Sequence, residues 1–372
     1  MVMAGPATAR RPHGSVPLFS LLGIKRLHRR SLGGPAGSEP MVGPIRAWLL
    51  DESPGAYRYG EVEVPDPGPG EAWVRVVASA LNHLDLWLRK GMPKPPMSPM
   101  VPGCDGAGTV AAIGEGVTRW QVGDEVVINP SFACGRCIQC LSDRSVFCPE
   151  FGIMGEHYWG AHGEFVVVRE ANLVAKPPAL SWEAACSYGL CGLTVYRMLR
   201  RARLAAGETL LVVGAGGGVG SAALAIGQRM GAQVYVTSRD PAKRAHAIEL
   251  GAVDAFPSEE KIPVNADVVV DTVGSPTWAF SMGALVPGGR LVTCGGTGGG
   301  RVEVSLPRLF FGQYEIMGST MGTFREFDEL TRLVATGLPV QVDSVYPLAD
   351  YPLALARMEA GAQFGKVVLR HA

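Results

Sequence analysis

The 372-residue sequence lacks an excess of either charge. It has 34 lysine and arginine residues against 34 aspartate and glutamate residues, and no stripe of basic residues. This balance argues against nucleic acid or an anionic membrane surface as the partner. The sequence also lacks an apolar run of the roughly 18 residues that would span a bilayer. We therefore expect a soluble, cytoplasmic protein whose partner is a small molecule, with no nucleic acid and no membrane involved.

Residues 1–40 have almost no acidic side chains and no regular apolar pattern. They contain six basic residues and a single acid, Glu39, together with many Gly, Pro and Ser residues. An Arg-rich, acid-poor leader can be an organelle transit peptide, but Gly and Pro interrupt any amphipathic helix here. We favour a start codon assigned too early, with Met41 as the initiator, and expect a disordered segment. Organelle targeting is the alternative.

What the sequence does have is a cluster of cysteines. Cys134, Cys137, Cys140 and Cys148 are four of the eight cysteines and lie within fifteen residues. Four thiolates at this spacing can surround one tetrahedral zinc ion at about 2.3 Å and leave no open coordination position. Disulfides or an iron–sulfur cluster are the alternatives. We predict one structural zinc that stabilises a lobe at 130–150 and takes no part in catalysis.

A glycine-rich turn follows an apolar stretch at 210–213. After the turn come a segment of helical periodicity up to Met230 and a second apolar stretch at 233–237. This βαβ pattern predicts a dinucleotide site, because glycines let the backbone approach a pyrophosphate at the positive N-terminus of the helix. The predicted cofactor-binding residues of the turn are Gly214, Gly216, Gly217, Gly218, Val219 and Gly220.

The end of the second predicted strand indicates which nucleotide is bound. An acidic residue there would bind the ribose hydroxyls and repel a 2′-phosphate. The sequence has Ser238 and Arg239 instead, with Lys243 one helical turn later, and these side chains suit a phosphate. Asp240 is expected to cap the next helix ahead of Pro241. We predict NADP(H) in preference to NAD(H); the alternative is that Arg239 only lies on the surface.

Further apolar segments at 266–274, 288–300 and 314–323 alternate with helical segments. The alternation predicts an α/β fold with a mostly parallel sheet and helices on both faces. Ligands bind at the carboxyl ends of such strands. We therefore expect Gly274, Gly295 and Gly318 to lie near the cofactor, some of them only as turn residues.

From about Met41 onward, the sequence resembles the medium-chain dehydrogenase/reductase superfamily, which includes zinc-containing alcohol dehydrogenases and quinone reductases. The resemblance rests on GEAWVRVVASALNHLDLWLRKG, PGCDGAGTVAAIGEGVTRWQVGDEVV, the cysteine lobe, LTVYRML, the glycine turn and QFGKVVL. It implies a Rossmann doubly wound parallel sheet at 186–322 and a GroES-like β-barrel catalytic domain at 41–185 and 323–372. It also implies a homodimer or homotetramer joined through the Rossmann-domain edges.

The resemblance fails at the catalytic zinc of the alcohol dehydrogenases. Aligned on Asp85, Asn82 takes the place of a cysteine ligand, and Cys104 takes the place of a histidine ligand. Leu190 takes the place of the third ligand, with Cys191 one residue later.

An improvised zinc site from Cys104, Asp105 and Cys191 is conceivable, since cysteine and carboxylate both bind zinc. The alternative is that the two cysteines pack as small apolar groups. Trp87 also replaces the family's proton-relay histidine. We predict a single, structural zinc and no catalytic one.

The function predicted from this resemblance is NADP(H)-dependent hydride transfer to an activated C=C bond or a quinone, without catalytic zinc. ALNHLD is similar to the pattern of zinc-free members of the superfamily, which implies that Asn82 lies near the nicotinamide and Thr194 near its carboxamide. His83 is expected to contact the cofactor, and Asp85 to orient His83 or the backbone. The alternatives are an alcohol or aldehyde dehydrogenase with a variant zinc site and an NADPH-binding protein without turnover.

The proton donor is not identified by any motif. The loop at 155–160 offers Glu156, His157 and Tyr158, but three polar residues before a strand are typical of a solvated loop. We expect that loop to be solvated and the proton to come from water.

Overall fold

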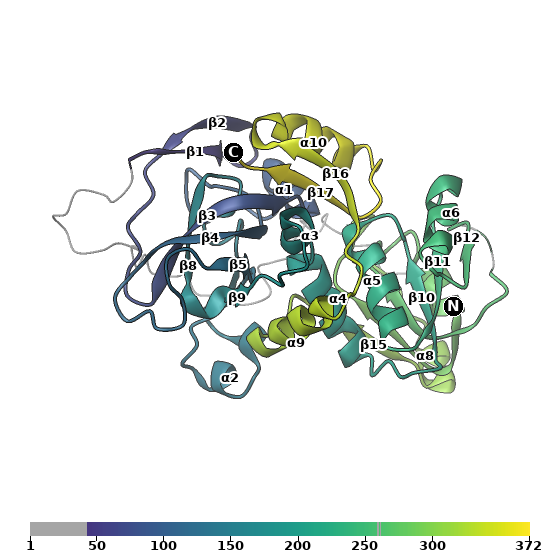
Figure 1. Ribbon diagram of the computed structural model, residues 1–372. Helices are drawn as coiled ribbons and strands as arrows, with labels where there is room; N and C mark the ends of the chain where they lie inside the picture. Colours follow the sequence, from purple (N-terminus) through teal and green to yellow (C-terminus); the bar gives the residue numbers. More distant parts are fainter. Residues whose placement is uncertain (1–42, 259, 261) are drawn as a thin grey trace, which may run out of the picture. The chain divides into compact units, whose positions relative to one another are not determined.

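The computed structural model describes residues 43–258, 260 and 262–372 (Figure 1). The predictions made for residues 1–40, and the choice of Met41 as initiator, lie outside the described residues.

A six-stranded parallel sheet carries the predicted nucleotide site. Its strands run in the order β12-β11-β10-β13-β14-β15, and every neighbouring pair is parallel. The strands are β10 (Thr209–Val213), β11 (Gln233–Thr237), β12 (Asp254–Phe256), β13 (Ala266–Asp271), β14 (Leu285–Thr293) and β15 (Glu315–Gly318). The helices associated with them are α4 (Gly189–Arg201), α5 (Gly218–Arg229), α6 (Pro241–Glu249), α7 (Trp278–Gly283) and α8 (Leu306–Gly312).

Helices cover both faces of this sheet because its central strands are apolar on both sides. Leu210 and Val212 of β10 pack into the core cluster that includes residues of α4 and α5. Leu211 and Val213 point the opposite way and pack with Trp278 of α7. Successive side chains of a strand alternate between faces, so the continuous apolar run of β10 produces two cores. The predicted doubly wound α/β fold is confirmed.

A second sheet, mostly antiparallel, carries the other half of the site. Its strands run in the order β16-β17-β3-β4-β5-β9, and β8 also pairs with β3. They are β3 (Glu71–Ala80), β4 (Asp105–Ile113), β5 (Glu125–Ile128), β8 (Phe165–Arg169), β9 (Leu173–Ala175), β16 (Val342–Pro347) and β17 (Lys366–Arg370). β17 pairs with β3 although the whole parallel sheet lies between them in the sequence. The chain therefore leaves this sheet, completes the parallel one, and returns.

Short elements complete the described chain. β1 (Ile45–Leu50) pairs with β2 (Tyr57–Val62), and β6 (Ser131–Phe132) pairs with β7 (Gly152–Ile153). The remaining helices are α1 (His83–Arg89), α2 (Ile138–Leu141), α3 (Trp182–Ser187), α9 (Phe324–Ala335) and α10 (Tyr351–Glu359), and short 3₁₀ turns lie at η1 (Ser145–Phe147), η2 (Glu170–Asn172) and η3 (Leu348–Asp350). The β6–β7 pair closes the base of the cysteine lobe.

The two sheets occupy separate parts of the sequence. All strands of the parallel sheet fall within 186–322, and all strands of the second sheet fall within 41–185 and 323–372. The exact domain boundaries stay a prediction; the one at 185/186 falls inside α3.

Helix α9 holds α4, the helix that carries Cys191 and Thr194. It begins with a capping box, in which the Thr323 side chain accepts the Glu326 N–H and the Glu326 carboxylate accepts the Thr323 N–H. The same carboxylate accepts a hydrogen bond of 2.8 Å from Arg197 Nη1 of α4. This charged link lies between largely buried side chains and fixes the position of α4.

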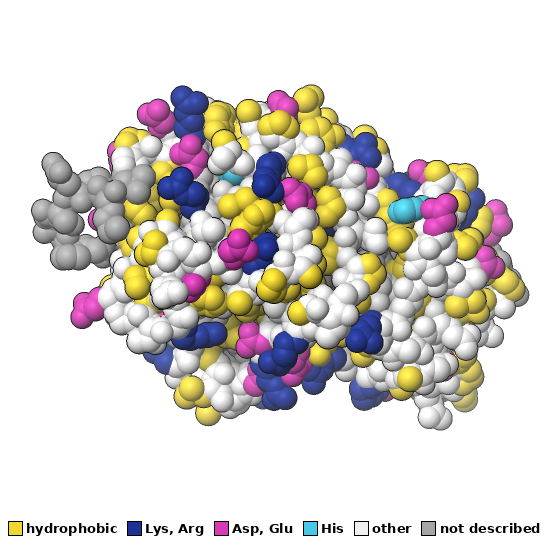
Figure 2. All heavy atoms as spheres, viewed as in Figure 1, with side chains coloured by type: hydrophobic (Ala, Val, Ile, Leu, Met, Phe, Trp, Pro, Cys, Tyr) yellow, Lys and Arg dark blue, Asp and Glu magenta, His cyan; other side chains and the backbone are white. Residues whose placement is uncertain are grey.

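The surface has no segregation of charge on the face that Figure 2 shows, where basic and acidic side chains are interspersed. Arg325, for example, lies 3.0 Å from Glu329 on α9. Within the described residues, no helix is both long enough and apolar enough to cross a membrane.

Candidate active site and zinc lobe

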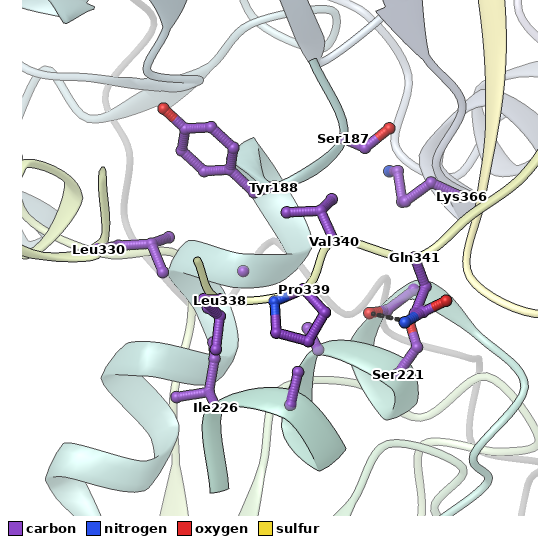
Figure 3. Close-up of a pocket in the computed structure, with 14 residues that line it drawn as sticks. Ser187, Tyr188, Ser221, Ile226, Leu330, Leu338, Pro339, Val340, Gln341 and Lys366 are labelled. Carbon is purple, nitrogen blue, oxygen red and sulfur yellow. Dashed lines mark hydrogen bonds between the residues drawn. The ribbon is translucent and has the colours of Figure 1, made fainter. Parts of the chain in front are cut away.

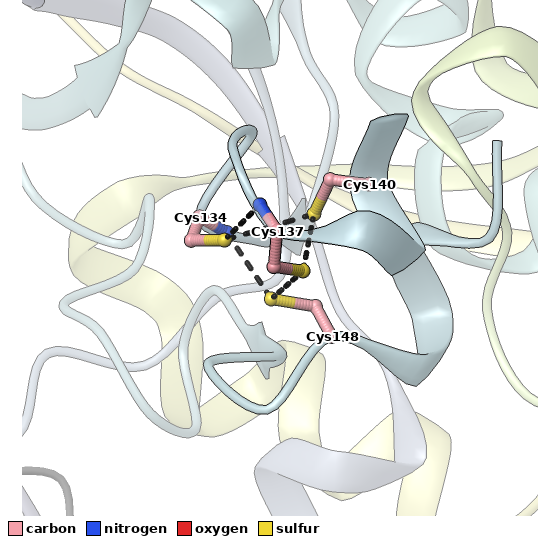
Figure 4. Close-up of side chains that lie close together, drawn as sticks. All are labelled: Cys134, Cys137, Cys140 and Cys148. Atoms are coloured by element: carbon pink, nitrogen blue, oxygen red, sulfur yellow. Dashed lines mark hydrogen bonds between the residues drawn. The ribbon is translucent and has the colours of Figure 1, made fainter. Parts of the chain in front are cut away.

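The four lobe cysteines converge on one point (Figure 4). Their sulfur atoms all lie within 4.8 Å of one another, with separations of 3.6 Å between Cys137 and Cys140 and 3.8 Å between Cys137 and Cys148. Four sulfurs at about 2.3 Å from one zinc ion in tetrahedral geometry lie about 3.8 Å apart. All eight cysteines are free thiols, so no disulfide competes for these sulfurs. The residues therefore fit a structural zinc.

Backbone N–H groups around the lobe favour thiolates. The N–H groups of Cys137 and Glu150 point at Cys134 Sγ and Cys148 Sγ, both at 3.3 Å. Burial opposes ionisation at Cys134, but N–H groups from Arg136 and Cys137 outweigh it and lower the pKa of this thiol to about 7. Thiolates are the form that binds metal. Gly135, with φ of +75°, makes the tight turn between the first two cysteines.

The glycine turn leaves the start of α5 open. Gly214 directly follows β10 and has φ of +91°, a conformation that favours glycine. A Cβ on Gly220 would lie 2.1 Å from the Gly214 carbonyl oxygen, whereas a Cβ on Gly217 would meet no atom within 4 Å. Gly217 is the N-cap of α5, and Gly218 and half-buried Val219 begin the helix. A phosphate can therefore approach the N-terminal N–H groups of α5; contact with a cofactor stays a prediction.

The residues after β11 provide cations and no free acid. Ser238 is buried and Arg239 is exposed. The Asp240 carboxylate accepts the Ala242 N–H at 2.8 Å, so its predicted role as the cap of α6 is confirmed. Lys243 lies against the glycine turn, since a Cβ on Gly216 would come within 2.7 Å of its Cδ.

The glycines after β13 and β14 differ in role. Gly274 has φ of +90°, and its Cβ position lies 2.3 Å from the Gly299 carbonyl oxygen, so it is required by the turn itself. Gly295 accepts a hydrogen bond of 2.9 Å from Thr293 Oγ1 through its carbonyl oxygen. At Gly318 a Cβ would meet nothing within 4 Å. Each follows or ends its strand at the carboxyl edge of the parallel sheet; that they lie near a cofactor stays a prediction.

A buried ammonium group lies where the resemblance placed a catalytic metal. Lys366 Nζ, on the first residue of β17, donates to Asn82 Oδ1 at 2.7 Å and to Asp105 Oδ2 at 2.8 Å. Cys191 Sγ lies 3.9 Å from the same nitrogen. The exposed fractions of these four residues are 4% for Lys366, 5% for Asn82, 0% for Asp105 and 7% for Cys191. We call this group the lysine cluster.

Hydrogen bonds orient every member of the lysine cluster. Asp105 Oδ1 accepts the Leu190 N–H at 2.6 Å, and its Oδ2 also accepts the Asn82 side-chain N–H at 3.0 Å. Burial alone would lower the pKa of Lys366, but the Asp105 carboxylate and the Cys191 thiol raise it above its usual value. Lys366 is therefore a fixed positive charge at neutral pH.

Lys366 also borders the nucleotide site. A Cβ on Gly218, at the start of α5, would lie 3.0 Å from Lys366 Cδ and 2.8 Å from Cys191 Sγ. Figure 3 shows Lys366 at the edge of a pocket whose apolar wall is formed by Ile226, Leu330, Leu338, Pro339 and Val340. The ammonium thus lies between the end of β3 and the helix start predicted to bind phosphate.

The proposed alternative zinc ligands do not converge. Cys104 packs in an apolar cluster with Leu84, Leu88 and Met100, and burial raises the pKa of its thiol well above the usual value. In residues 43–258, 260 and 262–372, only the lobe cysteines form a group of three or more His, Cys, Asp or Glu side chains placed to share one ion.

The other predicted site residues lie around the start of α1 and on α4. His83 is exposed, while Asp85 and Thr194 are buried. Asp85 Oδ2 accepts the Asn82 N–H at 2.7 Å, so the carboxylate orients the backbone of Asn82. Its Oδ1 accepts a hydrogen bond of 3.1 Å from the Tyr351 hydroxyl.

A buried histidine network, which the sequence did not indicate, adjoins Asp85. His162 Nε2 lies 3.3 Å from Asp85 Oδ1, and Ser79 Oγ lies 2.9 Å from both His162 Nδ1 and His371 Nε2. Burial, together with neighbouring His162, lowers the pKa of His371 to about 3, so this imidazole is neutral.

The expectation that loop 155–160 is solvated is wrong. Glu156 is only 6% exposed, and the Tyr158 ring stacks on Phe132 at 4.7 Å. The cause is Gly155, which has φ of +78° and lies so close to Gly103 that a Cβ would be 2.8 Å from that residue's carbonyl carbon. This close approach folds the loop inward, and nothing in its polar composition reveals it.

Lys366 was not predicted as a site residue, although QFGKVVL is one of the segments that carry the family resemblance. The available signal was a lysine at the start of the apolar strand KVVL, because a cation in a buried strand requires a partner of opposite charge.

Comparisons with known proteins agree with this architecture. Residues 68–178 match the model of the alcohol dehydrogenase GroES-like domain, and residues 218–336 match that of the zinc-binding dehydrogenase family. Acryloyl-coenzyme A reductase of Metallosphaera sedula is 33% identical over 322 residues, which cover 84% of this chain and 96% of that protein.

Two solved structures are similar over nearly the same range. An NAD-dependent alcohol dehydrogenase is 38% identical with a TM-score of 0.83, covering 87% of this chain and 99% of its own. A 2-octenoyl-CoA carboxylase reductase, solved with NADP and 2-octenoyl-CoA, is 26% identical with a TM-score of 0.84, covering 89% of this chain and 88% of its own.

The GroES-like match includes the lobe cysteines and Asp105, and the dehydrogenase match begins at Gly218, where α5 begins. With both halves matched in the predicted order, the chain belongs to the medium-chain dehydrogenase/reductase superfamily and is an NAD(P)-dependent oxidoreductase of that type.

Proposed function

We propose that this protein is an NADP(H)-dependent reductase of activated C=C bonds or quinones that works without a catalytic zinc. The observation that carries the proposal is the Lys366 ammonium, 2.7 Å from Asn82 Oδ1 and 2.8 Å from Asp105 Oδ2. A zinc ion placed among Asn82, Asp105 and Cys191 would have to displace this ammonium. Two positive charges cannot share one buried carboxylate at such distances without strong repulsion.

The lysine cluster suits a reaction in which negative charge develops on a conjugated oxygen. NADPH would supply the hydride. Lys366 and the Asn82 side chain provide N–H donors that are fixed before the reaction, and fixed donors stabilise developing charge at low reorganisation cost. Asp105 holds both donors in place. A simple alcohol lacks conjugation that could spread such charge, and its oxidation normally depends on a Lewis acid.

The relatives support this choice of substrate class. Acryloyl-coenzyme A reductase and the 2-octenoyl-CoA carboxylase reductase both carry names of conjugated thioesters. A quinone oxidoreductase of Pseudomonas aeruginosa is 30% identical over 337 residues. Enones, enals, α,β-unsaturated thioesters and quinones are therefore the substrates to test first. Alcohol dehydrogenases among the relatives keep alcohols as the second candidate.

The cofactor preference rests on the end of β11. Half-buried Lys243 lies beside the glycine turn, and Arg239 at the end of β11 is exposed. The two acids near Lys243 are both engaged, Asp240 as the cap of α6 and Asp343 with Arg357. A 2′-phosphate would find cations there and no free carboxylate. The proposal is therefore NADP(H) in preference to NAD(H), with one structural zinc per chain.

The proposed oligomer is a homodimer or homotetramer joined at β15. This strand is the last in the parallel sheet, and exposed Leu306, Phe310, Phe311 and Ile316 lie on it and on α8. A sheet edge with apolar neighbours favours pairing with a second copy. Phe311→Glu should convert the oligomer to smaller species in light scattering. The free thiols favour the reducing cytoplasm as the compartment.

The test combines zinc content with turnover. We expect about one zinc per chain by elemental analysis and oxidation of NADPH with an enone, a 2-enoyl thioester or a quinone. Two zinc ions per chain together with alcohol oxidation would replace the proposal by the zinc-dependent alternative. Tight NADPH binding with no turnover of any of these substrates would indicate a binding protein.

A further inference from the structure

We propose that Glu156 is the catalytic acid that protonates the α-carbon of the substrate after hydride has reached the β-carbon. This inference rests on the proposed reduction of conjugated C=C bonds and identifies the proton donor of that same site. The loop at 155–160 that carries Glu156 is neither a metal ligand nor part of the nucleotide turn.

The loop is clamped to the segment that leads into the lysine cluster. The Gly160 N–H donates to the Val101 carbonyl at 2.8 Å, and the Ala161 N–H donates to the Gly103 carbonyl at 2.9 Å. A Cβ on Gly160 would lie 2.3 Å from the Gly103 carbonyl oxygen. Asp105 follows two residues after Gly103, so this contact fixes Glu156 next to the start of β4.

Apolar side chains on both sides of Glu156 face the same region. Ile153 and Trp159 pack against the apolar cluster that contains Cys104, together with Trp87 and Leu190. Leu190 also donates its N–H to Asp105. Glu156 thus lies in a loop whose neighbours pack against the same apolar cluster as Leu190, next to the start of β4, and its carboxyl group is buried.

This environment keeps the carboxyl group protonated near neutrality. Burial raises the pKa of Glu156 to about 7. The titratable groups that face it are His157 on its own loop and Cys104 on the clamped segment. Burial lowers the pKa of His157 and raises that of Cys104, so both neighbours are neutral. Glu156 therefore has no cation to hold it as a carboxylate.

His157 does not take the proton from Glu156 in the resting state. Its Nδ1 lies 3.6 Å from Glu156 Oε1 but accepts the Ile153 N–H at 3.2 Å. The His157 side chain is 22% exposed, so this residue connects the buried carboxyl group with solvent.

The reaction balances with these groups. The hydride brings two electrons to the β-carbon and forms a C–H bond, the C=C π pair moves toward the carbonyl, and an enolate forms whose oxygen faces Lys366. The enolate then re-forms C=O while the α-carbon takes the proton from the Glu156 carboxyl. NADPH has become NADP⁺, the C=C bond is reduced, and the Glu156 carboxylate regains a proton from water.

The test uses the full-length protein in D2O with a 2-enoyl thioester substituted at the α-carbon. The wild-type protein should place deuterium on one face of the α-carbon, and kcat should decrease above pH about 7. Glu156→Gln should lower kcat by about 10²-fold, lose that pH limb and scramble the α-carbon configuration, with NADPH binding unchanged. Glu61→Gln, an exposed carboxylate on β2, is the matched control and should behave like wild type.

Unchanged stereochemistry and pH profile in Glu156→Gln would overturn the assignment while leaving the proposed reductase intact. Absence of wild-type turnover on all conjugated substrates would instead reject the proposed function itself. If Glu156→Gln is unstable, Glu156→Ala replaces it and is assayed with and without formate. Formate should raise kcat of Glu156→Ala at least tenfold; a smaller increase counts against a proton-donor role.

Discussion

Replacing Lys366 by methionine should both destabilise the protein and slow its reaction. Methionine has a similar length and no charge, so the change removes the ammonium and leaves the packing of the stem. Asp105 would remain fully buried with two of the three donors to its carboxylate, the backbone N–H of Leu190 and the side-chain amide of Asn82.

The expected decrease in the free energy of unfolding follows from the loss of the ammonium as a partner of Asp105. Removing one partner of a buried ion pair costs about 3–5 kcal/mol, and the two remaining donors place Lys366→Met near the lower value, about 3 kcal/mol. Asp105→Asn should cost a similar amount, because it removes the negative charge that balances the buried ammonium. The double variant Lys366→Met/Asp105→Asn should be more stable than the sum of the two losses predicts, since no buried charge remains.

The assay is urea unfolding of each variant, in which the midpoint shifts while the slope of free energy against urea concentration stays constant. It is combined with kcat on the substrate that the wild-type protein reduces best. We expect kcat of Lys366→Met to be lower by about 10²–10³, the usual effect of removing one fixed donor from a developing oxyanion. Lys90→Met is the control, because Lys90 is half exposed and lies 3.6 Å from Glu359. An exposed pair of that kind contributes about 0–1 kcal/mol.

If Lys366→Met lowers the free energy of unfolding no more than Lys90→Met does, and leaves kcat unchanged, Lys366 contributes neither to stability nor to the reaction. A stability loss without a rate loss would leave the ion pair as a purely structural feature. Gain of a second zinc and of alcohol oxidation in Lys366→Met would show that the ammonium excludes a metal that the site can otherwise hold.

Three further changes test other parts of the structure. Cys137→Ser should release zinc and lower the melting temperature, whereas Cys294→Ser, outside the lobe, should keep one zinc per chain in elemental analysis. Arg239→Ala should raise KM for NADPH by about tenfold, the usual effect of losing one charged hydrogen bond, and leave KM for NADH unchanged; equal effects on both cofactors would contradict a phosphate contact. The pKa of His371 is about 3 when folded and 6.5 in its ordinary state, so the unfolded chain binds the proton first as pH falls. Stability should therefore decrease from pH 6.5 down to pH 3, by up to about 5 kcal/mol, and His371→Gln should flatten this dependence in urea titrations.

The features that could be predicted from the sequence are local ones. The four lobe cysteines lie within one segment of at most about 30 residues, and so do the apolar stretches that flank the glycine turn. Each motif can therefore be recognised without knowing its distant partners. The Asp240 cap was predicted for the same reason, since its partner Ala242 is two residues away.

The features that could not be predicted depend on distant partners. Lys366 meets Asp105 across 261 positions of the sequence, and no local pattern marks a lysine that will be buried beside a carboxylate. The burial of Glu156 depends on the contact between Gly155 and Gly103, two glycines that look like ordinary turn residues. Strand β12, only Asp254–Phe256, was missed because three residues at a sheet edge are too few to show a periodicity.

The lysine cluster also constrains the order of events during synthesis. At about 5–20 residues per second, the 261 residues between Asp105 and Lys366 take roughly 13–50 s to translate. Throughout that time Asp105 has no counter-charge and β3 lacks β17 as its neighbour. A ribosome-bound chain that stops before Lys366 would therefore hold an open sheet edge and an unpaired carboxylate, and the lysine cluster would form only when the strand KVVLR is released.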